Sequence, residues 1–264
     1  MSLITLMTDF GTCNVYVGVM KGVIAQIAPQ VPTIDLTHAV PPQDIVTARF
    51  NLMSSCPYFP EGTVHCVVVD PGVGTARRAV AVEAQIQGQT QYFVAPDNGV
   101  LDGILAEARR AVSLTCADYW RLPMPSQTFH GRDVFAPVAA HLAIGVGLAR
   151  LGKAVLIESL VRLQTEDAIA IPNGYRGCIQ YIDGFGNAIT NLGAEILPSG
   201  PWQIQAGGQS IVSRATYGEA ATGTLLALVG SDGWVEIAVN RGSAADCLNL
   251  QVGSPVTLTW ETSN

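Results

Sequence analysis

A few carboxylates, an arginine and a histidine occur in this chain where side chains can act on a bound ligand. The segment VVVDPGVGTARR, residues 67–78, runs from an apolar stretch into Asp70 and then through a glycine-rich loop to two arginines. A carboxylate that ends a buried parallel strand lies at the edge of the sheet where open α/β proteins bind ligands. Such a group suits acid–base chemistry, although an aspartate in a loop can also simply cap it.

Two further aspartates share this kind of position, and one histidine lies in a loop before a predicted helix. Asp9 follows LITLMT, and Asp97 lies in FVAPDNG, each with a glycine within two residues. Glycine lets a ligand approach the backbone closely. The segment TFHGRDVFAP places His130 in a polar loop before a predicted helix, where Asp133 could cap the helix and Arg132 could pair with a carboxylate. A lone histidine is more often structural, but its place beside a glycine favours a role at a site.

The second half of the chain offers polar groups that could recognise a base. Asp183 and Asn187 flank Gly-Phe-Gly in YIDGFGNAITNL, which predicts a tight hairpin turn. An asparagine amide can also make two hydrogen bonds to the edge of an adenine. The segment GSDGWVEIAVN holds Ser231, Glu236 and Val239, which could line a pocket or belong to an ordinary turn and strand.

Composition excludes several classes of protein. The net charge is −7 and no run of Lys or Arg exceeds two residues, so a nucleic-acid partner is not expected. The loop DPGVGT lacks the GKS or GKT of a P-loop, and DFGTCN stands where a GxGxxG would follow the first strand. No apolar stretch is long enough for a membrane span, so no membrane partner is expected.

The N-terminus and the cysteines suggest a compartment. The N-terminus MSLITLMTDFG has no basic region and reads as a first strand, not a signal peptide. The six cysteines are scattered without a CxxC pair, so we expect them to be reduced and mostly buried, and zinc is not expected on them. These features favour a cytoplasmic protein.

Hydrophobic periodicity in the first half predicts alternating strands and helices. Val15, Val19, Val23 and Ile27 share one face of the first predicted helix. The alternation predicts an α/β fold class with a largely parallel sheet in the N-terminal domain. The predicted strands are 3–11, 33–40, 63–70, 79–84 and 91–99, and the predicted helices are 15–29, 42–59, 99–110 and 133–145.

The pattern changes near residues 164–174, which are polar and rich in turn residues. Short β-type segments split by glycines follow, and they predict an all-β, barrel-like or sandwich C-terminal domain. We place the boundary near 166–172, which gives an N-terminal domain over 1–165 and a C-terminal domain over 172–264.

Taken together, six blocks resemble one family. MTDFGT, IDLTHAVPPQDI, YFPEGTVHCVVVDPGVGTARR, FVAPDNGVL, FHGRDVFAPVAAHLA and YIDGFGNAITNL run in order from residue 7 to residue 192. They resemble the S-adenosyl-L-methionine (SAM) hydrolases that form adenosine, the SAM hydroxide adenosyltransferase group, which is related to the fluorinases and chlorinases. DPGVGTxRR combined with FHGRD is a specific signature, whereas any one block alone is weak.

The resemblance implies an α/β domain followed by a β-barrel-like domain, in a homotrimer that binds SAM between the N-terminal domain of one subunit and the C-terminal domain of the next. It implies no cofactor, since SAM is the substrate, and no metal. By motif, Asp70, Arg77 and His130 would assist the attacking water. Residues that would bind substrate or adenosine are Asp9 on the ribose diol, with Asp70, Asp183, Asn187, Ser231, Glu236 and Val239.

The implied chemistry is attack of water on ribose C5′ from the side opposite sulfur. Methionine leaves as a neutral thioether and needs no acid, so the enzyme must orient and deprotonate water. Asp70 is the natural acceptor, and Arg77 would keep it ionised. Arg78 could replace Arg77 or lie at the surface.

Three alternatives stay open. A SAM-dependent halogenase resembles the chain, but fluorinases carry a tyrosine in place of Asp70, a serine in place of Gly131 and an extra loop, and a carboxylate would repel halide. An adenosine-binding module without turnover would need the pocket but not the Asp70, Arg77 and His130 set. A methyltransferase would need an acidic residue ending the second strand, whereas Asp35 lies within it.

Overall fold

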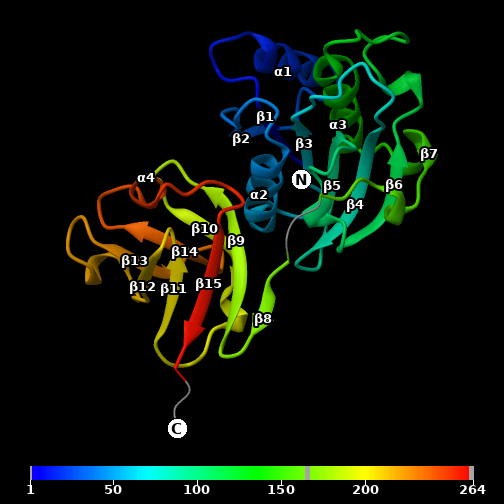
Figure 1. The fold of residues 1–264 in the computed structure, drawn as a ribbon. Helices are drawn as coiled ribbons and strands as arrows, with labels where there is room; N and C mark the ends of the chain where they lie inside the picture. The colour runs from blue at the N-terminus through cyan, green and yellow to red at the C-terminus, as the bar shows by residue number, and fades with distance from the viewer. Residues whose placement is uncertain (1, 164–166, 262–264) are drawn as a thin grey trace. The chain divides into compact units, whose positions relative to one another are not determined.

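A computed structural model describes residues 2–163 and 167–261, which belong to two compact units, 1–163 and 164–264 (Figure 1). The end predicted for the N-terminal domain, residue 165, lies outside the described residues. The stretch left between the two predicted domains contains strand β8, Ile169–Ile171, which pairs with β9 of the second unit.

The first unit is built on a seven-stranded sheet in the order β2-β1-β3-β5-β4-β6-β7. Strands β2, β1, β3 and β5 are parallel neighbours, whereas β5, β4, β6 and β7 pair antiparallel. The α/β class is therefore confirmed, but the sheet is mixed instead of largely parallel. The strands are Ile4–Thr8 (β1), Thr33–Thr37 (β2), Val64–Val68 (β3), Ala79–Ile86 (β4), Gln89–Pro96 (β5), Ala108–Ser113 (β6) and Lys153–Ala154 (β7).

A two-residue turn explains the change of direction. Gln87 and Gly88 join β4 to β5, with φ values of 48° and 80°. Positive φ at both central residues is the geometry of the tight hairpin turn that suits the twist of antiparallel strands. Because the hairpin reverses the chain at once, β4 and β5 cannot be parallel.

Helices cover both faces of this sheet. Helix α1 (Tyr16–Ile27) and helix α3 (Ala136–Ala143) pack on one face with alternate residues of β1 and β3, and α2 (Ile45–Ser55) packs on the other (Figure 1). The Asp44 side chain caps α2 by accepting a hydrogen bond from the Thr47 backbone N–H at 2.9 Å. None of the helices among the described residues has the length and apolarity needed to span a bilayer.

The face predicted to bury helix α1 is only partly right. Val23 is buried as expected, but Val15 is 74% exposed and Val19 is 37% exposed. The core side of the helix is formed by Met20, Val23 and Ile24. Apolar residues occur on more than one face of this helix, so their spacing could not identify the buried one.

The helix predicted over 99–110 is wrong. Gly99 has a φ of +98°, and a Cβ on Gly103 would lie 1.8 Å from the Met53 sulfur. The chain therefore turns tightly against α2, forming only a short 3₁₀ turn at Asp102–Ile104. It then enters strand β6, which pairs antiparallel with β4.

The second unit is an antiparallel, eight-stranded sheet, as the sequence predicted for a β-rich domain. The order is β12-β11-β15-β9-β10-β14-β13, with β8 on β9. A bridge between Ser213 and Ala227 brings the ends of the order together, so the sheet is nearly closed into a barrel. Its remaining elements are β9 (Gly174–Ile182), β10 (Ala188–Gly193), β11 (Trp202–Ala206), β12 (Gln209–Val212), β13 (Leu225–Val229), β14 (Trp234–Val239), α4 (Ala244–Leu248) and β15 (Pro255–Trp260).

One buried histidine makes stability depend on pH. The His65 ring is fully buried in β3, with Nδ1 2.7 Å from Thr5 Oγ1 and Nε2 3.0 Å from Gln91 Oε1, and it stacks on Phe93. Burial lowers the pKa of His65 from 6.5 to about 4, against the smaller opposing effect of the Gln91 hydrogen bond. The ring is therefore neutral in the native protein over most of the range in which it titrates in the unfolded chain.

Between pH 6.5 and about 4, His65 is protonated in the unfolded chain but neutral in the native protein. We therefore expect the free energy of unfolding to decrease as the pH falls through this range. The shift corresponds to a loss of about 3 kcal/mol by pH 4. Urea unfolding of the wild type and of His65→Gln across this range measures the loss as the difference in their pH slopes. Parallel slopes would contradict the assignment.

Candidate active site

A pocket of about 420 Å³ opens at the carboxyl ends of β1, β2 and β3, which is where the sequence predicted a ligand site. Its lining comes from the loops after these three strands, from the start of α1 and from the turn before the π-helical segment Gly131–Phe135. The lining residues are Asp9, Phe10, Tyr16, Pro42, Gln43, Val68, Asp70, Pro71, Val73, Thr128, Phe129, His130 and Gly131.

Asp70 and His130 line this pocket, and Arg77 joins them into one connected group. Arg77 Nε donates to Asp70 Oδ1 at 2.8 Å, and Arg77 Nη2 donates to Asp70 Oδ2. The same Nη2 lies 2.8 Å from His130 Nδ1. The Asp70 and Arg77 side chains are only 5% and 10% exposed, and the guanidinium lies over the Phe135 ring. A two-pronged contact of this kind fixes the orientation of the carboxylate.

The glycine-rich loop allows this closure over seven residues. Gly74 has a φ of +75°, and a Cβ there would lie 2.3 Å from the Gln127 carbonyl oxygen. Only glycine fits such a position without strain. The loop therefore packs directly against the chain that leads to His130, which brings the two motifs together.

The second arginine serves a different carboxylate. Arg78 Nε donates to Asp97 Oδ2 at 2.6 Å, and Nη1 donates to Ser159 Oγ at 3.0 Å. Asp97 also accepts the Val161 backbone N–H at 2.8 Å. Asp97 and Arg78 thus form a structural pair outside the pocket lining, and it is Arg77 that reaches Asp70.

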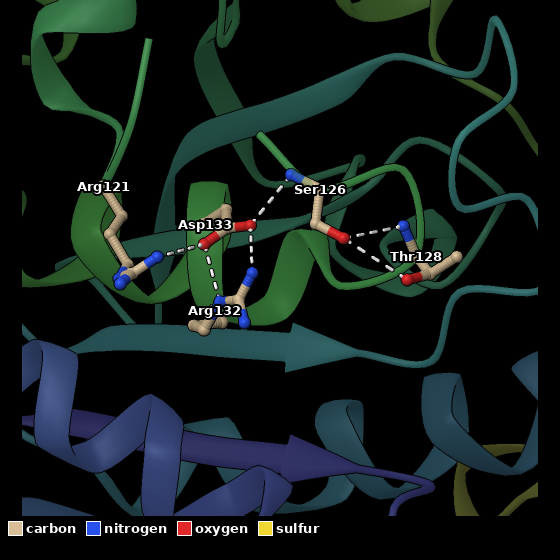
Figure 2. A network of polar contacts seen from close by, with 5 residues as sticks. All are labelled: Arg121, Ser126, Thr128, Arg132 and Asp133. Carbon is tan, nitrogen blue, oxygen red and sulfur yellow. Dashed lines mark hydrogen bonds and ion pairs between the residues drawn. The ribbon is translucent and has the colours of Figure 1, made fainter. Parts of the chain in front are cut away.

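A buried aspartate anchors the segment that carries His130. Asp133 is fully buried and accepts hydrogen bonds from Arg132 Nε at 2.7 Å, Arg132 Nη2 at 2.6 Å and the Ser126 backbone N–H at 2.9 Å (Figure 2). Arg121 Nη1 completes the network at 3.3 Å, and Ser126 Oγ accepts from the Thr128 N–H. Burial opposes the ionisation of Asp133, but the hydrogen bonds from Arg132 and Ser126 outweigh it and lower the pKa of this carboxyl. The network ties the loop before His130 to the π-helical turn after it.

The environment of His130 keeps its ring neutral. Burial lowers the pKa of His130, and the Arg77 charge lowers it further, against weaker opposing effects of Asp70 and Asp133. The π-helical turn begins directly after it, with the Ala136 N–H bonded to the Gly131 carbonyl. Such wide turns are rare and occur frequently at functional sites.

Asp9 lies on the same pocket wall as Asp70. Its Oδ2 accepts the Gln43 backbone N–H at 2.8 Å, and Gln43 has a φ of 68°, which is uncommon for a residue other than glycine. This contact holds the loop after β2 against the loop after β1. The carboxylate keeps lone pairs with which it could accept hydroxyl groups of a ligand.

Sequence reasoning missed an aromatic wall of the pocket. Phe10, Tyr16 and Phe129 contact one another edge to face, with centroids 5.3 to 5.8 Å apart. The Arg132 guanidinium lies over Phe129 at 5.2 Å. Phe10 follows Asp9 and Phe129 precedes His130 in the sequence. Their position next to predicted site residues could have indicated that they line the pocket.

The second unit has a pocket of about 470 Å³ of its own. Asn187 lies in it, and its Nδ2 donates to Asp183 Oδ2 at 2.9 Å, while Asp183 Oδ1 accepts the backbone N–H groups of Phe185 and Asn187. This fixes the amide so that its oxygen and one remaining N–H can serve a ligand. The lining residues are Phe185, Asn187, Tyr217, Val239, Asn240, Arg241 and Gly242.

The other three predicted positions of this unit differ in their placement. Val239 lines the pocket, whereas Glu236 is buried and accepts a hydrogen bond from Tyr217, which does line it. Burial raises the pKa of Glu236 against the opposing effect of the Tyr217 hydrogen bond, and the charge of Asp183 adds to the rise. Ser231 is exposed in the turn between β13 and β14 and is not among the lining residues. Tyr217 was missed, since it is far from the recognised motifs in sequence.

The fold and the two pockets define a class of protein: an α/β unit with a carboxylate, arginine and histidine at its strand ends, followed by a nearly closed antiparallel unit. Models of the N-terminal and C-terminal domains of SAM hydroxide adenosyltransferase match residues 4–152 and 177–257. The chain therefore belongs to the SAM hydroxide adenosyltransferase family, as the sequence motifs indicated.

Individual relatives agree with this assignment. An (R)-S-adenosyl-L-methionine hydrolase of Thermus thermophilus is 44% identical, over 96% of this chain and 97% of the relative. A fluorinase of Actinoplanes is 27% identical, over 97% of each chain. The crystal structure of an uncharacterized conserved protein from Thermotoga maritima matches with a TM-score of 0.90 and 35% identity, over 98% of this chain and 100% of that one.

Proposed function

We propose that this protein hydrolyses SAM to adenosine and L-methionine, by attack of water at ribose C5′. The observation that carries the proposal is that Asp70 and His130 line one pocket and that Arg77 joins them by hydrogen bonds. Because the Thermus relative bears the name of an (R)-S-adenosyl-L-methionine hydrolase, the proposal includes the (R) form as substrate.

The pocket has the groups that this reaction needs. A sulfonium is a cation, and the carboxylates of Asp9 and Asp70, together with the aromatic wall, favour a cation. Asp70 would accept a proton from the attacking water, and Arg77 holds its carboxylate in one orientation. General-base assistance is worth about 10²–10⁴ in rate, and fixing the water in line with C5′ adds to that.

Residues of both units would recognise different parts of SAM. Asp9 would bind the ribose diol, and Asn187, oriented by Asp183, would bind the adenine edge. Val239 would contact adenosine from the pocket wall, and Glu236 would act through its bond to Tyr217. Ser231, exposed in its turn, would contribute at the rim of a site completed by another subunit.

The proposal extends to the assembly and its compartment. The sequence resemblance supports a homotrimer with its sites at subunit interfaces. Free thiols at Cys13, Cys56, Cys66, Cys116 and Cys247 support a reducing compartment, the cytoplasm.

Light scattering of the purified chain, whose mass is 27.8 kDa, tests the trimer, and a monomer at working concentration would contradict it.

Two other functions make different chemical demands. A halogenase would have to bring halide next to the Asp70 carboxylate, which repels it, and the fluorinase relative is less similar than the hydrolase. A binding module without turnover would have no use for a carboxylate fixed by Arg77 beside a neutral histidine. One experiment separates all three.

Purified protein is incubated with a mixture of both sulfonium epimers of SAM in ¹⁸O water and chloride buffer, and the products are read by mass spectrometry. Adenosine carrying ¹⁸O at the 5′ position, with release of methionine and depletion of the (R) epimer, is the expected result. Chlorinated product would favour a halogenase. SAM that stays intact would favour the binding module.

A further inference from the structure

The contact between Arg77 and His130 fixes which nitrogen of the imidazole carries a proton. A guanidinium has five N–H donors and no acceptor. Arg77 Nη2 lies 2.8 Å from His130 Nδ1, so Nδ1 must be the acceptor. A nitrogen that accepts a hydrogen bond in the ring plane carries no proton of its own.

The count of hydrogens on Arg77 agrees with this reading. Its Nε–H goes to Asp70 Oδ1 at 2.8 Å, and one hydrogen of Nη2 goes to Asp70 Oδ2. The second hydrogen of Nη2 points away from the carboxylate in the planar group, and His130 Nδ1 lies there to receive it. Arg77 therefore serves both neighbours without sharing any hydrogen between them.

The proton of the neutral ring must then be on Nε2. Burial and the adjacent Arg77 charge lower the pKa of His130, which disfavours the doubly protonated form near neutral pH. Nε2 makes no hydrogen bond to any residue that the structure describes. Because His130 lines the pocket and its Nδ1 is occupied, Nε2 is the nitrogen left for a pocket ligand.

We infer that His130 meets the attacking water as an Nε2–H donor, so that the Asp70 carboxylate is the proton acceptor of this group. The inference rests on the proposed function and deepens it, because it assigns different tasks to two residues that sequence motifs group together. His130 orients the water, and Asp70 takes its proton.

The reaction balances with these roles. The water oxygen forms a bond to C5′ while the C5′–S bond breaks, and the bonding pair stays on sulfur, which leaves neutral methionine. One water proton passes to Asp70, which becomes a neutral carboxyl group and later releases the proton to solvent. The oxygen becomes strongly acidic as it bonds to C5′, so a carboxylate held by an arginine is basic enough to accept the proton.

The Nε2–H of His130 would orient the attacking water. Water has two lone pairs, and an N–H that engages one of them directs the other toward C5′, while the Asp70 oxygen receives a hydrogen. A water held by one donor and one acceptor is restricted in position and rotation before the reaction begins. A histidine acting as a base would leave the water without that donor.

Nuclear magnetic resonance of protein labelled with ¹⁵N at its four histidines reads the tautomer directly. The His130 signals are those missing from His130→Gln, and elimination with single substitutions at His38, His65 and His141 assigns them independently. Near neutral pH the expected pattern is an unprotonated Nδ1 and a protonated Nε2. A protonated Nδ1, a doubly protonated ring or an average of two tautomers would overturn the inference.

Kinetics test the donor role. His130→Gln keeps an amide N–H that reaches the region of Nε2, whereas His130→Leu keeps only bulk. We expect kcat to fall within about 10-fold for the glutamine variant and by about 10²–10³-fold for the leucine variant, the usual effect of losing one positioned donor. Equal losses in two folded variants would overturn the donor role.

The two failures can be told apart. A wild-type protein that releases no adenosine from SAM would overturn the proposed function and, with it, any role of His130 in this reaction. An active wild type with the other tautomer, or with equal losses in both variants, would overturn the inference about His130 alone.

Discussion

Asp70→Asn is expected to lower kcat for SAM hydrolysis by about 10²–10⁴-fold, the usual range for general-base assistance, while adenosine still binds. The amide keeps the size of the carboxylate but loses its charge and its ability to accept a proton. Arg77, only 10% exposed, would also lose its charged partner. Adenosine release measured by chromatography and adenosine affinity measured by calorimetry separate the two effects.

Asp97→Asn is the matched control, since Asp97 is also paired with an arginine and its side chain is equally buried, at 5%. It lies outside the pocket lining, so we expect lower stability toward urea but nearly unchanged kcat. Wild-type turnover in Asp70→Asn would refute the assignment of Asp70. Equal loss of kcat in both variants would show that kcat falls because the arginine pairs at the strand ends are disturbed, and not because a proton acceptor is lost.

Asn187→Ala should instead weaken binding. Its amide is buried and held by Asp183, so it can make two hydrogen bonds to a base at little entropic cost. Losing a contact of this type costs about 1–3 kcal/mol, which corresponds to roughly 5- to 150-fold in KM and in adenosine affinity. We expect kcat to change little, because the amide is not proposed to touch the reacting atoms.

Gln205→Ala serves as the control for this variant, because Gln205 is an exposed amide on β11 that lines neither pocket. It should leave KM unchanged. An Asn187→Ala protein with wild-type KM and wild-type adenosine affinity would remove Asn187 from the site. A large loss of kcat without a change in KM would instead assign it to the chemical step.

The identity of the arginine partner shows how far sequence could lead. The motif supplied Asp70, two arginines and His130, but spacing alone left Arg77 and Arg78 as alternatives. Neighbouring side chains that enter a strand point to opposite sides, so one arginine goes to Asp70 and the other to Asp97. Which of them faces the pocket depends on how the chain enters β4, and that is a tertiary property.

The mistaken helix over 99–110 has a similar origin. Leu101, Ile104, Leu105 and Ala108 have helical spacing, and all four are buried. The spacing of apolar residues thus identified which residues are buried, but not the backbone conformation of the segment that contains them. The missing Cβ of Gly103 makes room for Met53 of α2, a contact that no local pattern contains.

The pocket walls were the least predictable part of the site. Phe10, Tyr16 and Phe129 come from three segments and meet only because the fold brings them together. Tyr217 is 19 residues from Glu236 in sequence and bonds to it across the second unit. Motifs identify residues that share a segment, whereas aromatic walls and supporting hydrogen bonds are assembled from distant ones.

The wide turn at Gly131–Phe135 sets the direction of the His130 side chain relative to the buried face of α3, the helix that follows it. Seven of the eight residues of α3 are buried, so packing fixes the rotation of that helix. A π-turn holds one residue more than an α-turn, and each residue of a helix turns the chain by about 100°. The extra residue therefore lets His130 aim into the pocket while α3 keeps its own alignment with the core. Removing the extra residue would rotate His130 by about 100° relative to α3 and would also displace the buried side chains of Asp133 and Phe135. The direction of the imidazole and the packing of this turn are therefore set together.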